Sequence, residues 1–387
     1  MIQSFDVFIL LIFVPVQWHI TVLWLRAARR RAGLRATALR RATFLLDALL
    51  GIGWLLDFIP ALGGPVIPGR LSLVLRTLTL AWGFAATAVV ALRAILHPLH
   101  KIAGAEFHPG RRRVIQAAGN LALATPFAAL AYGALIERLD FRVREVDVPI
   151  PGLPDDLDGM RVLHLSDIHL SPFLSEAELA RVIDAANGLR PHLAAVTGDL
   201  ISHRGDPIDA CIGQLARLKA DAGVVACMGN HEHYAQIEEY TAAQAARVGI
   251  RFLRSESQPL RFGNATLNVA GVDYQPLNHK GGYLRGAGRL VVPGETNVLL
   301  SHNPDVFPVA ARQGYNLMLS GHTHGGQVSV EILDQAINPA RFFTHFVYGL
   351  YRQGSAAAYV TRGIGTIGIP ARIGAPPEIS LLRLRKA

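Results

Sequence analysis

Long apolar runs occupy most of the first 140 residues, whereas the rest of the chain alternates short apolar runs with polar stretches. About 20 apolar residues suffice for a helix to cross a bilayer. Residues 6–25 and 114–136 have this length, and a third run at residues 71–96 carries Arg76 and Arg93 near its ends, where long side chains can reach the membrane surface. We therefore expect an N-terminal α-helical transmembrane region.

A fourth apolar run, residues 44–64, contains Asp47 and Asp57, and we interpret it as either a span or a hairpin. Residues 26–41 contain seven arginines and no acidic residue, and a second basic stretch covers residues 93–113. Short loops rich in Lys and Arg stay on the cytoplasmic side. Because an even number of crossings must separate the two basic stretches, residues 44–64 and 71–96 either both span or both do not.

In either case the last span points outward, so residues after about 137 are predicted to be extracytoplasmic. The sequence GRRRVIQ before this span partly matches a twin-arginine export signal, although Gln116 replaces the usual lysine. It also fits the positive flank of an anchor, and although ALA at residues 129–131 resembles a cleavage motif, we expect the anchor to be retained. The expected location is the bacterial cytoplasmic membrane, with several spans and the C-terminal domain outside.

From Val148 onward the pattern is that of an α/β domain, in which short apolar strands alternate with helical stretches after the Pro- and Gly-rich lead-in VPIPGLPDDLDG. We expect three segments: a transmembrane helical region at 1–112, a last anchor and linker at 113–147, and the α/β domain at 148–387. Helices are predicted at 176–189, 207–219 and 238–248. Strands are predicted at 161–165, 193–197, 223–228, 259–262, 266–271, 297–301, 316–320, 357–362 and 378–384.

Composition and charge support this division. Of the 387 residues 51% are hydrophobic, and the formal net charge is +9. The first 144 residues hold 17 of the 38 Lys and Arg but only six of the 29 Asp and Glu, so the α/β part is close to neutral. A nucleic-acid-binding domain would need its own basic surface, and we therefore expect no nucleic-acid partner. The two cysteines, Cys211 and Cys227, are too few for a disulfide framework.

Polar side chains follow five of the predicted strands, at the point where each strand ends. The five clusters are Asp167 with His169, Asp199, Asn230 with His231, His302, and His322 with His324 in the sequence LSGHTHGGQ. Ligand sites of open α/β folds gather at the carboxyl ends of strands, so these clusters can converge on one site. His164, in contrast, alternates with core residues inside a strand and is predicted to be structural.

The residue types indicate the chemistry of such a site. Aspartate, asparagine and histidine without cysteine suit divalent Mn, Fe, Zn or Co, and there are too many ligands for one ion. Two ions bridged by a carboxylate, with a hydroxide between them, can clamp both oxygens of a phosphoryl transfer, and we assign the bridge to Asp199. Gly198, Gly229 and Gly321 precede ligands and permit sharp reversals and close backbone approach.

The motifs D-x-H, GD, GNHE, H and GHTHGGQ, in this order, resemble the calcineurin-like metallophosphoesterases, and with the lead-in PGLPDDLDG they resemble the bacterial membrane-attached branch that includes phosphodiesterases. The resemblance covers residues 148–387. It implies a four-layer α/β/β/α sandwich with two mixed sheets. It implies one ion held by Asp167, His169 and His324, another held by Asn230, His302 and His322, Asp199 as the bridge, and His231 as proton donor to the leaving oxygen. Glu232 stands where many relatives have aspartate, which we expect to alter only how His231 is oriented.

The expected function is that of a membrane-anchored phosphoesterase with two divalent ions, most simply a phosphodiesterase, whose metal-bridging hydroxide cleaves a phosphate ester or diphosphate of a membrane or cell-envelope substrate. Its expected partners are the bilayer and that substrate. Two alternatives remain. One is a UDP-2,3-diacylglucosamine-type pyrophosphatase acting at the cytoplasmic face, and the other is a membrane sensor or scaffold that binds a ligand without turnover.

Overall fold

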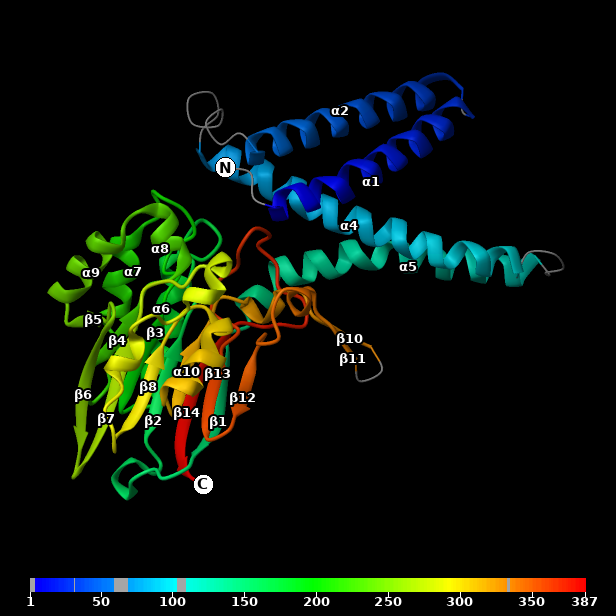
Figure 1. The fold of residues 1–387 in the computed structure, drawn as a ribbon. Helices are drawn as coiled ribbons and strands as arrows, with labels where there is room; N and C mark the ends of the chain where they lie inside the picture. Colours follow the sequence, from blue (N-terminus) through cyan, green and yellow to red (C-terminus); the bar gives the residue numbers. More distant parts are fainter. Residues whose placement is uncertain (1–3, 31, 59–68, 103–108, 333–334) are drawn as a thin grey trace. The chain divides into compact units, whose positions relative to one another are not determined.

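The computed structural model describes residues 4–30, 32–58, 69–102, 109–332 and 335–387. Two compact units make up the chain, one of residues 1–132 with 368–370 and the other of residues 133–367 with 371–387. Figure 1 shows the first unit as helices alone and the second as sheets with helices. The division falls within residues 113–147, where we expected the last anchor and a linker.

The first unit consists of long helices, as the apolar runs predict. They are α1 (Ser4–Arg29), α2 (Gly33–Phe58), α4 (Gly69–Ile102) and most of α5 (Pro109–Leu135). Within the described residues, three helical stretches are long and apolar enough to cross a membrane: Leu10–Arg29, Val74–Ile95 and Ala117–Leu139. They correspond to the runs at 6–25, 71–96 and 114–136. Residues 44–58 of the run at 44–64 form the second half of α2, and this helix is not among the three stretches. Residues 59–64 of the run lie outside the described residues.

Asp47, which made α2 an uncertain span, is paired with polar groups of α1. Its carboxylate accepts hydrogen bonds from Gln17 Nε2 at 2.7 Å and from Thr21 Oγ1 at 2.9 Å, and Trp82 Nε1 of α4 donates to Gln17 Oε1 at 2.8 Å. Polar residues inside a membrane normally pair within a helix bundle in this way. The burial of Asp47 in a bilayer would therefore leave no unsatisfied carboxylate.

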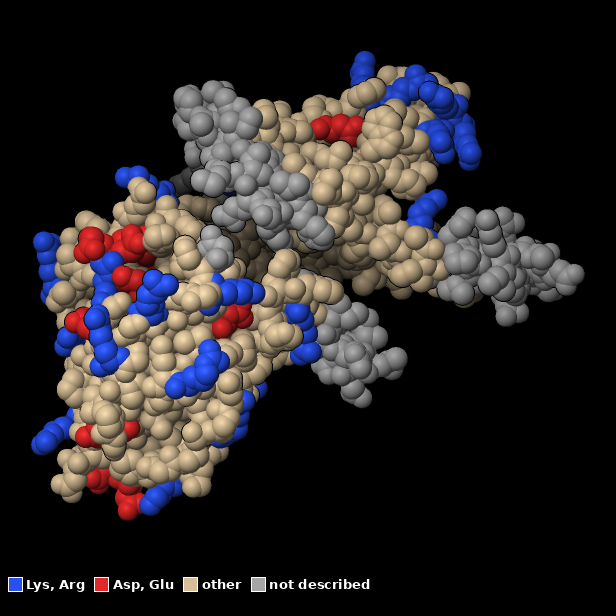
Figure 2. Space-filling model, in the orientation of Figure 1, with Lys and Arg blue, Asp and Glu red and all other residues tan. Residues whose placement is uncertain are grey.

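Most of the described arginines of residues 26–41 lie in helices rather than in the loop that we expected: Arg26 and Arg29 are in the last turn of α1, and Arg35, Arg40 and Arg41 are in α2. The helix α1 ends at Arg29 and α2 begins at Gly33. Figure 2 shows Lys and Arg side chains gathered at this turn.

The second unit contains two six-stranded mixed sheets. The first has the order β1-β14-β2-β3-β4-β5, in which only β14 and β2 are antiparallel neighbours. Its strands are β1 (Arg142–Ile150), β2 (Arg161–Leu165), β3 (Leu193–Thr197), β4 (Val224–Cys227), β5 (Ile250–Phe252) and β14 (Glu378–Lys386). The second has the order β12-β13-β9-β8-β7-β6, with antiparallel pairs only at its two edges. Its strands are β6 (Glu256–Phe262), β7 (Ala265–Gly271), β8 (Thr296–Leu300), β9 (Leu317–Ser320), β12 (Gly349–Gln353) and β13 (Ala356–Val360).

The helices cover the outer faces of these sheets, which gives four layers (Figure 1). Alternate residues of a strand face opposite sides. In β3, Leu193 and Ala195 pack between the sheets, whereas Ala194 and Val196 pack beneath α6 and α7. The α-helices of the unit are α6 (Glu176–Gly188), α7 (Ile208–Leu215), α8 (Asn230–Ala235), α9 (Glu238–Arg247) and α10 (Phe307–Gln313), and β10 (Val330–Ile332) pairs antiparallel with β11 (Gln335–Ile337). The predicted α/β/β/α sandwich is therefore confirmed.

All nine predicted strand segments overlap strands, but β5, β10, β11, β12 and the longest missed strand, β1, were not predicted. The position of β1 matters most. This strand begins at Arg142, before residue 148 where we expected the domain to begin, and runs parallel to β14 at the sheet edge. Its first half alternates arginine with valine and is largely exposed, so it lacks an apolar run. Val148 and Ile150 at its end are buried in the core between the sheets, and Val146 packs against that core partly buried.

Candidate metal centre

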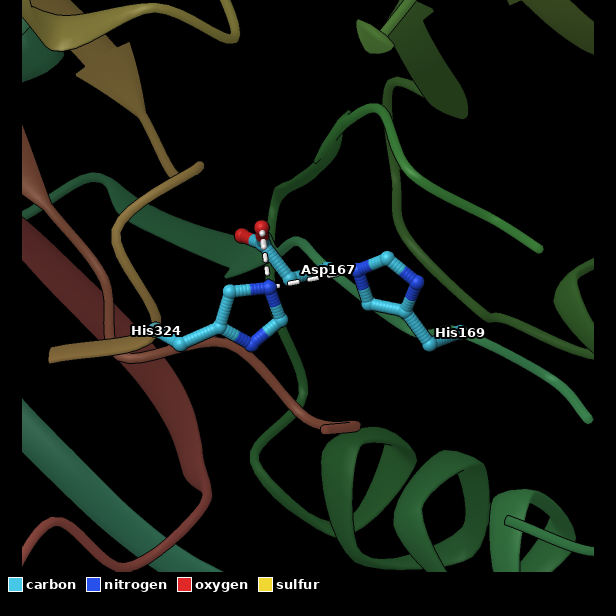
Figure 3. A group of neighbouring side chains, drawn as sticks. All are labelled: Asp167, His169 and His324. Atoms are coloured by element: carbon cyan, nitrogen blue, oxygen red, sulfur yellow. Dashed lines mark hydrogen bonds and ion pairs between the residues drawn. The ribbon is translucent and has the colours of Figure 1, made fainter. Parts of the chain in front are cut away.

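The predicted ligands from β2 and β9 meet at the end of the sandwich where these strands finish. His324 Nε2 lies 3.3 Å from Asp167 Oδ1 and 3.2 Å from His169 Nε2. Figure 3 shows the Asp167 carboxylate and the His169 ring both directed at this nitrogen of His324. The donor atoms of the three residues lie within 4.8 Å of one another, a spacing at which one ion can bind all three.

A second group forms around Asp199, which follows β3. His302 Nε2 lies 3.1 Å from Asp199 Oδ2, and His322 Nδ1 lies 3.2 Å from His302 Nε2. The two groups adjoin, because His169 Nε2 is only 3.6 Å from the same Asp199 oxygen. Asp199 therefore occupies the position between the groups that a bridging ligand requires.

His231 and Asn230 complete the set at the start of α8. The backbone N–H of His231 donates to Asp199 Oδ1 at 2.9 Å, and its Nε2 lies 3.9 Å from Asp199 Oδ2. His231 Nδ1 lies 2.6 Å from the carbonyl of Ser202, so Nδ1 carries a proton and Nε2 faces the centre. Asn230 is buried, and its Oδ1 has no hydrogen-bond partner among the described residues. A buried carbonyl oxygen that has no hydrogen-bond partner and lies beside these donors fits a cation ligand.

Five of these residues have a left-handed backbone although none is glycine. The φ angles lie between 50° and 74° at Asp167, His169, Asp199, His322 and His324. Residues other than glycine rarely adopt this conformation, which costs about 1–3 kcal/mol each and persists where the surrounding structure enforces it. Sharp turns directly after the strands thus direct each of these side chains toward the centre. The spacing of the motifs in the sequence did not reveal this backbone strain.

Two glycines are required by close packing around the carboxylates. A Cβ on Gly229 would lie 2.2 Å from Asp199 Oδ1, and a Cβ on Gly321 would lie 2.1 Å from Asp167 Oδ2. Any side chain at either position would displace a carboxylate. The expectation that Gly229 and Gly321 allow close backbone approach is therefore confirmed.

Hydrogen bonds outside the centre fix the orientation of the imidazoles. His302 Nδ1 lies 2.6 Å from the carbonyl of Thr197, and His169 Nδ1 lies 3.1 Å from Ser202 Oγ. In both residues Nε2 is left to face the centre. Such partners on the second ring nitrogen are typical of metal-binding histidines.

Glu232 does not orient His231, contrary to our expectation. It is fully buried, and its carboxylate accepts hydrogen bonds from the backbone N–H groups of Asp199 at 2.9 Å, Leu200 at 2.7 Å and Gly229 at 2.8 Å. Glu232 therefore ties the loop after β3 to the loop after β4. The glutamate side chain thus positions two donor-bearing loops rather than the His231 ring.

The electrostatics of the centre favour cation binding. Burial lowers the pKa of His322 to about 4 and that of His324 to about 3, and it lowers the pKa of His169 well below its usual value, so all three imidazoles keep a free lone pair at neutral pH. Burial alone would lower the pKa of His302, but the adjacent Asp199 carboxylate raises it to about 10. The negative charge of Asp199 that raises this pKa is a charge that a bound cation would neutralise.

The donor set therefore fits two divalent ions of borderline hardness. It offers two buried carboxylates, an amide oxygen without a hydrogen-bond partner and imidazoles, with no thiolate.

His164, predicted to be structural, is fully buried, and its Nε2 lies 2.9 Å from Thr197 Oγ1, away from this set. Tyr274, whose ring centroid lies 5.9 Å from that of His322, was not predicted, because it follows β7 without a recognisable motif.

Comparison with known proteins agrees with the motifs. Residues 160–326 match the family model described as calcineurin-like phosphoesterase. A metallophosphoesterase of Bacillus subtilis is 30% identical over 276 residues, which cover 67% of this chain and 94% of that protein. A "Transmembrane protein with metallophosphoesterase domain" of Danio rerio is 30% identical over 280 residues. That match covers 69% of this chain but only 62% of the Danio protein.

Among solved structures, the NAD nucleotidase of Haemophilus influenzae aligns with a TM-score of 0.36 and 12% identity, over 53% of this chain and 45% of that one.

Proposed function

The chain belongs to the calcineurin-like metallophosphoesterase family, the hydrolases of phosphoric esters, and from this premise we propose that it is a membrane-anchored phosphodiesterase with a dinuclear centre. The observation that supports the dinuclear centre is the position of Asp199 between two groups of donors. We assign Asp167, His169 and His324 to one ion, Asn230, His302 and His322 to the other, and Asp199 to both. Two such ions would supply a nucleophilic oxygen at neutral pH and neutralise charge on the phosphoryl group.

The chain's own residues then position the substrate and move a proton. Because the Ser202 carbonyl holds the proton on His231 Nδ1, Nε2 is the ring nitrogen that faces the centre, and the doubly protonated ring would pass its Nε2 proton to the departing alkoxide oxygen. The side chain of His231 is 15% exposed, so it lies where a substrate can reach it.

The membrane is the proposed source of the substrate. Three described helices are long and apolar enough to cross a bilayer, and the name of the Danio relative describes a transmembrane protein. In addition, Phe342 and Phe343, shortly after the GHTHGGQ loop, are 86% and 63% exposed. Exposed aromatic side chains beside a site favour a substrate with apolar chains. We propose a phosphoester of a membrane or cell-envelope lipid, met on the extracytoplasmic side.

The test is hydrolysis by the full-length protein in detergent of a chromogenic phosphodiester and of its monoester, with Mn²⁺ or with a chelator. We expect diester cleavage that requires metal and falls at least 1,000-fold in Asp199→Asn, because that variant weakens both ion sites together. Metal-independent turnover, or near-normal turnover by metal-loaded Asp199→Asn, would overturn the proposal. A folded protein that binds two ions but cleaves neither ester nor any envelope lipid would favour the sensor or scaffold.

A further inference from the structure

A pocket of about 190 Å³ lies at the start of β1, outside the group of metal donors. Three arginines line it, Arg142, Arg144 and Arg362, together with Pro376, Pro377 and Glu378. Sheet register places it at the same end of the sandwich as the donors: Arg142 pairs with Glu378, and β14 runs antiparallel to β2, which ends just before Asp167.

The pocket shares a wall with the metal centre. A Cβ on Gly325, next to His324, would lie 2.8 Å from Arg362 Cγ. A Cβ on Gly363, next to Arg362, would lie 2.6 Å from the Cβ of Asp167. Arg362 therefore stands between the two loops that carry these donors.

The pocket has three guanidinium groups and one carboxylate, so positive charge is in excess. Arg144 and Arg362 each lie 3.9 Å from Glu378 Oε2, beyond hydrogen-bond distance. Glu378 already accepts hydrogen bonds from the hydroxyls of Tyr359 and Ser380. Arg142 is paired with Asp140 at 2.7 Å and contributes less charge.

Exposed arginines on an edge strand are common, because they discourage pairing with other chains. Arg362 does not fit that explanation. Its side chain is only 18% exposed, it lies against the Tyr348 ring at 4.3 Å, and its buried Nε has no hydrogen-bond partner in the described part of the chain. A buried, incompletely paired guanidinium is costly unless an anion satisfies it.

Along the chain, the pocket comes directly after the last candidate membrane span. The apolar stretch Ala117–Leu139 ends three residues before Arg142, and each residue spans at most about 3.6 Å. The segment that leads to Pro376 and Pro377 is hydrogen-bonded to the end of this span. The backbone N–H of Arg372 donates to the Gly133 carbonyl at 3.2 Å, and that of Gly374 donates to the Glu137 carboxylate at 3.1 Å.

We propose that Arg144 and Arg362, supported by Arg142, bind the phosphate of an anionic lipid, so that the substrate's headgroup is held beside the metal centre. The inference rests on the proposed membrane substrate and adds a requirement for anionic charge on its headgroup. The planar guanidinium donates paired hydrogen bonds to phosphate oxygens, which an ammonium group cannot do.

The experiment measures lipid binding by the full-length protein in detergent, by native mass spectrometry, with short-chain phosphatidylglycerol, phosphatidylcholine and inorganic phosphate as probes. We expect phosphatidylglycerol to bind the wild type at least tenfold more tightly than it binds Arg144→Gln, since one charge-assisted bond is lost. Arg144 is half-exposed and suits substitution, whereas Arg362→Gln serves as the second variant. The control is Arg385→Gln, at the far end of β14 beside Asp147, which should bind like the wild type.

Equal phosphatidylglycerol binding by Arg144→Gln, Arg362→Gln and the wild type would overturn the inference. So would competition by inorganic phosphate at the same concentration as the lipid, because the occupant would then be free phosphate. Lipid binding is read without turnover, and Asp199→Asn should keep it. Failure of this inference is thus distinguishable from failure of the proposed hydrolysis, which Asp199→Asn tests separately.

Discussion

At the scale of single residues, His231 allows proton donation to be separated from metal binding. The variant His231→Gln should keep both bound ions but lose 100- to 10,000-fold in kcat for an alkyl ester, the range that proton transfer contributes. It should lose much less with a nitrophenyl ester, whose leaving group needs no proton. The control is His233→Gln, since His233 pairs with Glu238 at the surface and should be dispensable. Equal losses on both esters would refute the role of His231 as proton donor.

A methyl group at Gly229 tests the close packing around Asp199. In Gly229→Ala the new Cβ meets Asp199 Oδ1, so the carboxylate must move and both ions should bind at least tenfold more weakly. Calorimetric titration with Mn²⁺ measures the affinities. Gly188→Ala is the matched control, because nothing lies within 4 Å of a Cβ there. Unchanged metal affinity in Gly229→Ala would show that Asp199 needs no such fixed position.

Sequence alone located the residues of the centre better than it explained their geometry. Each donor could be found because it directly follows an apolar strand. The left-handed backbone at Asp167 and Asp199, the role of Glu232 and the pocket at Arg362 were not found. These features depend on tertiary contacts between loops far apart in the chain, for which local spacing carries no signal.

At the scale of elements, Glu232 connects two loops. Glu232→Gln replaces one acceptor oxygen by a donor group that faces backbone N–H groups, so at least one buried N–H loses its partner, at a cost of about 1–3 kcal/mol. We expect the Tm of the metal-free protein to fall by roughly 3–10 °C. Thermal unfolding of Glu232→Gln beside Glu239→Gln, whose side chain is 90% exposed, measures the difference. An unchanged Tm in both would contradict the role of Glu232 as a connector.

The strand β1 defines where a soluble fragment of the second unit can begin. A fragment from Glu137 keeps all of β1, whereas one from Val148 loses six of its nine residues and exposes the edge of β14. We expect the longer fragment to be monomeric and the shorter one to aggregate or to unfold at lower temperature, as size-exclusion chromatography and calorimetry can measure. Equal behaviour of the two fragments would show that β1 is dispensable for the sandwich.

At the scale of the whole molecule, the open question is which side of the membrane the second unit faces. Arginines at the α1–α2 turn and at the start of α5 favour a cytoplasmic position for both, which requires α2 and α4 to span together. The pairing of Asp47 with Gln17 and Thr21 makes α2 compatible with spanning, although its composition alone does not identify it as a span.

A reporter fused after Ala387 tests this topology. We expect alkaline phosphatase fused there to be active, because it folds only outside the cytoplasm, and a fluorescent reporter that requires the cytoplasm to stay dark. The reverse pattern would place the centre at the cytoplasmic face and favour the diphosphate-cleaving alternative.

The most direct test of the account is the number of ions that the full-length chain binds. Elemental analysis of protein equilibrated with Mn²⁺ should give two ions per chain, and His324→Ala should reduce this to one, because His324 belongs to one donor group only. Asp199→Ala should weaken both ions. A single ion in the wild type, or two tightly held ions in Asp199→Ala, would contradict the bridged centre on which the proposed function depends.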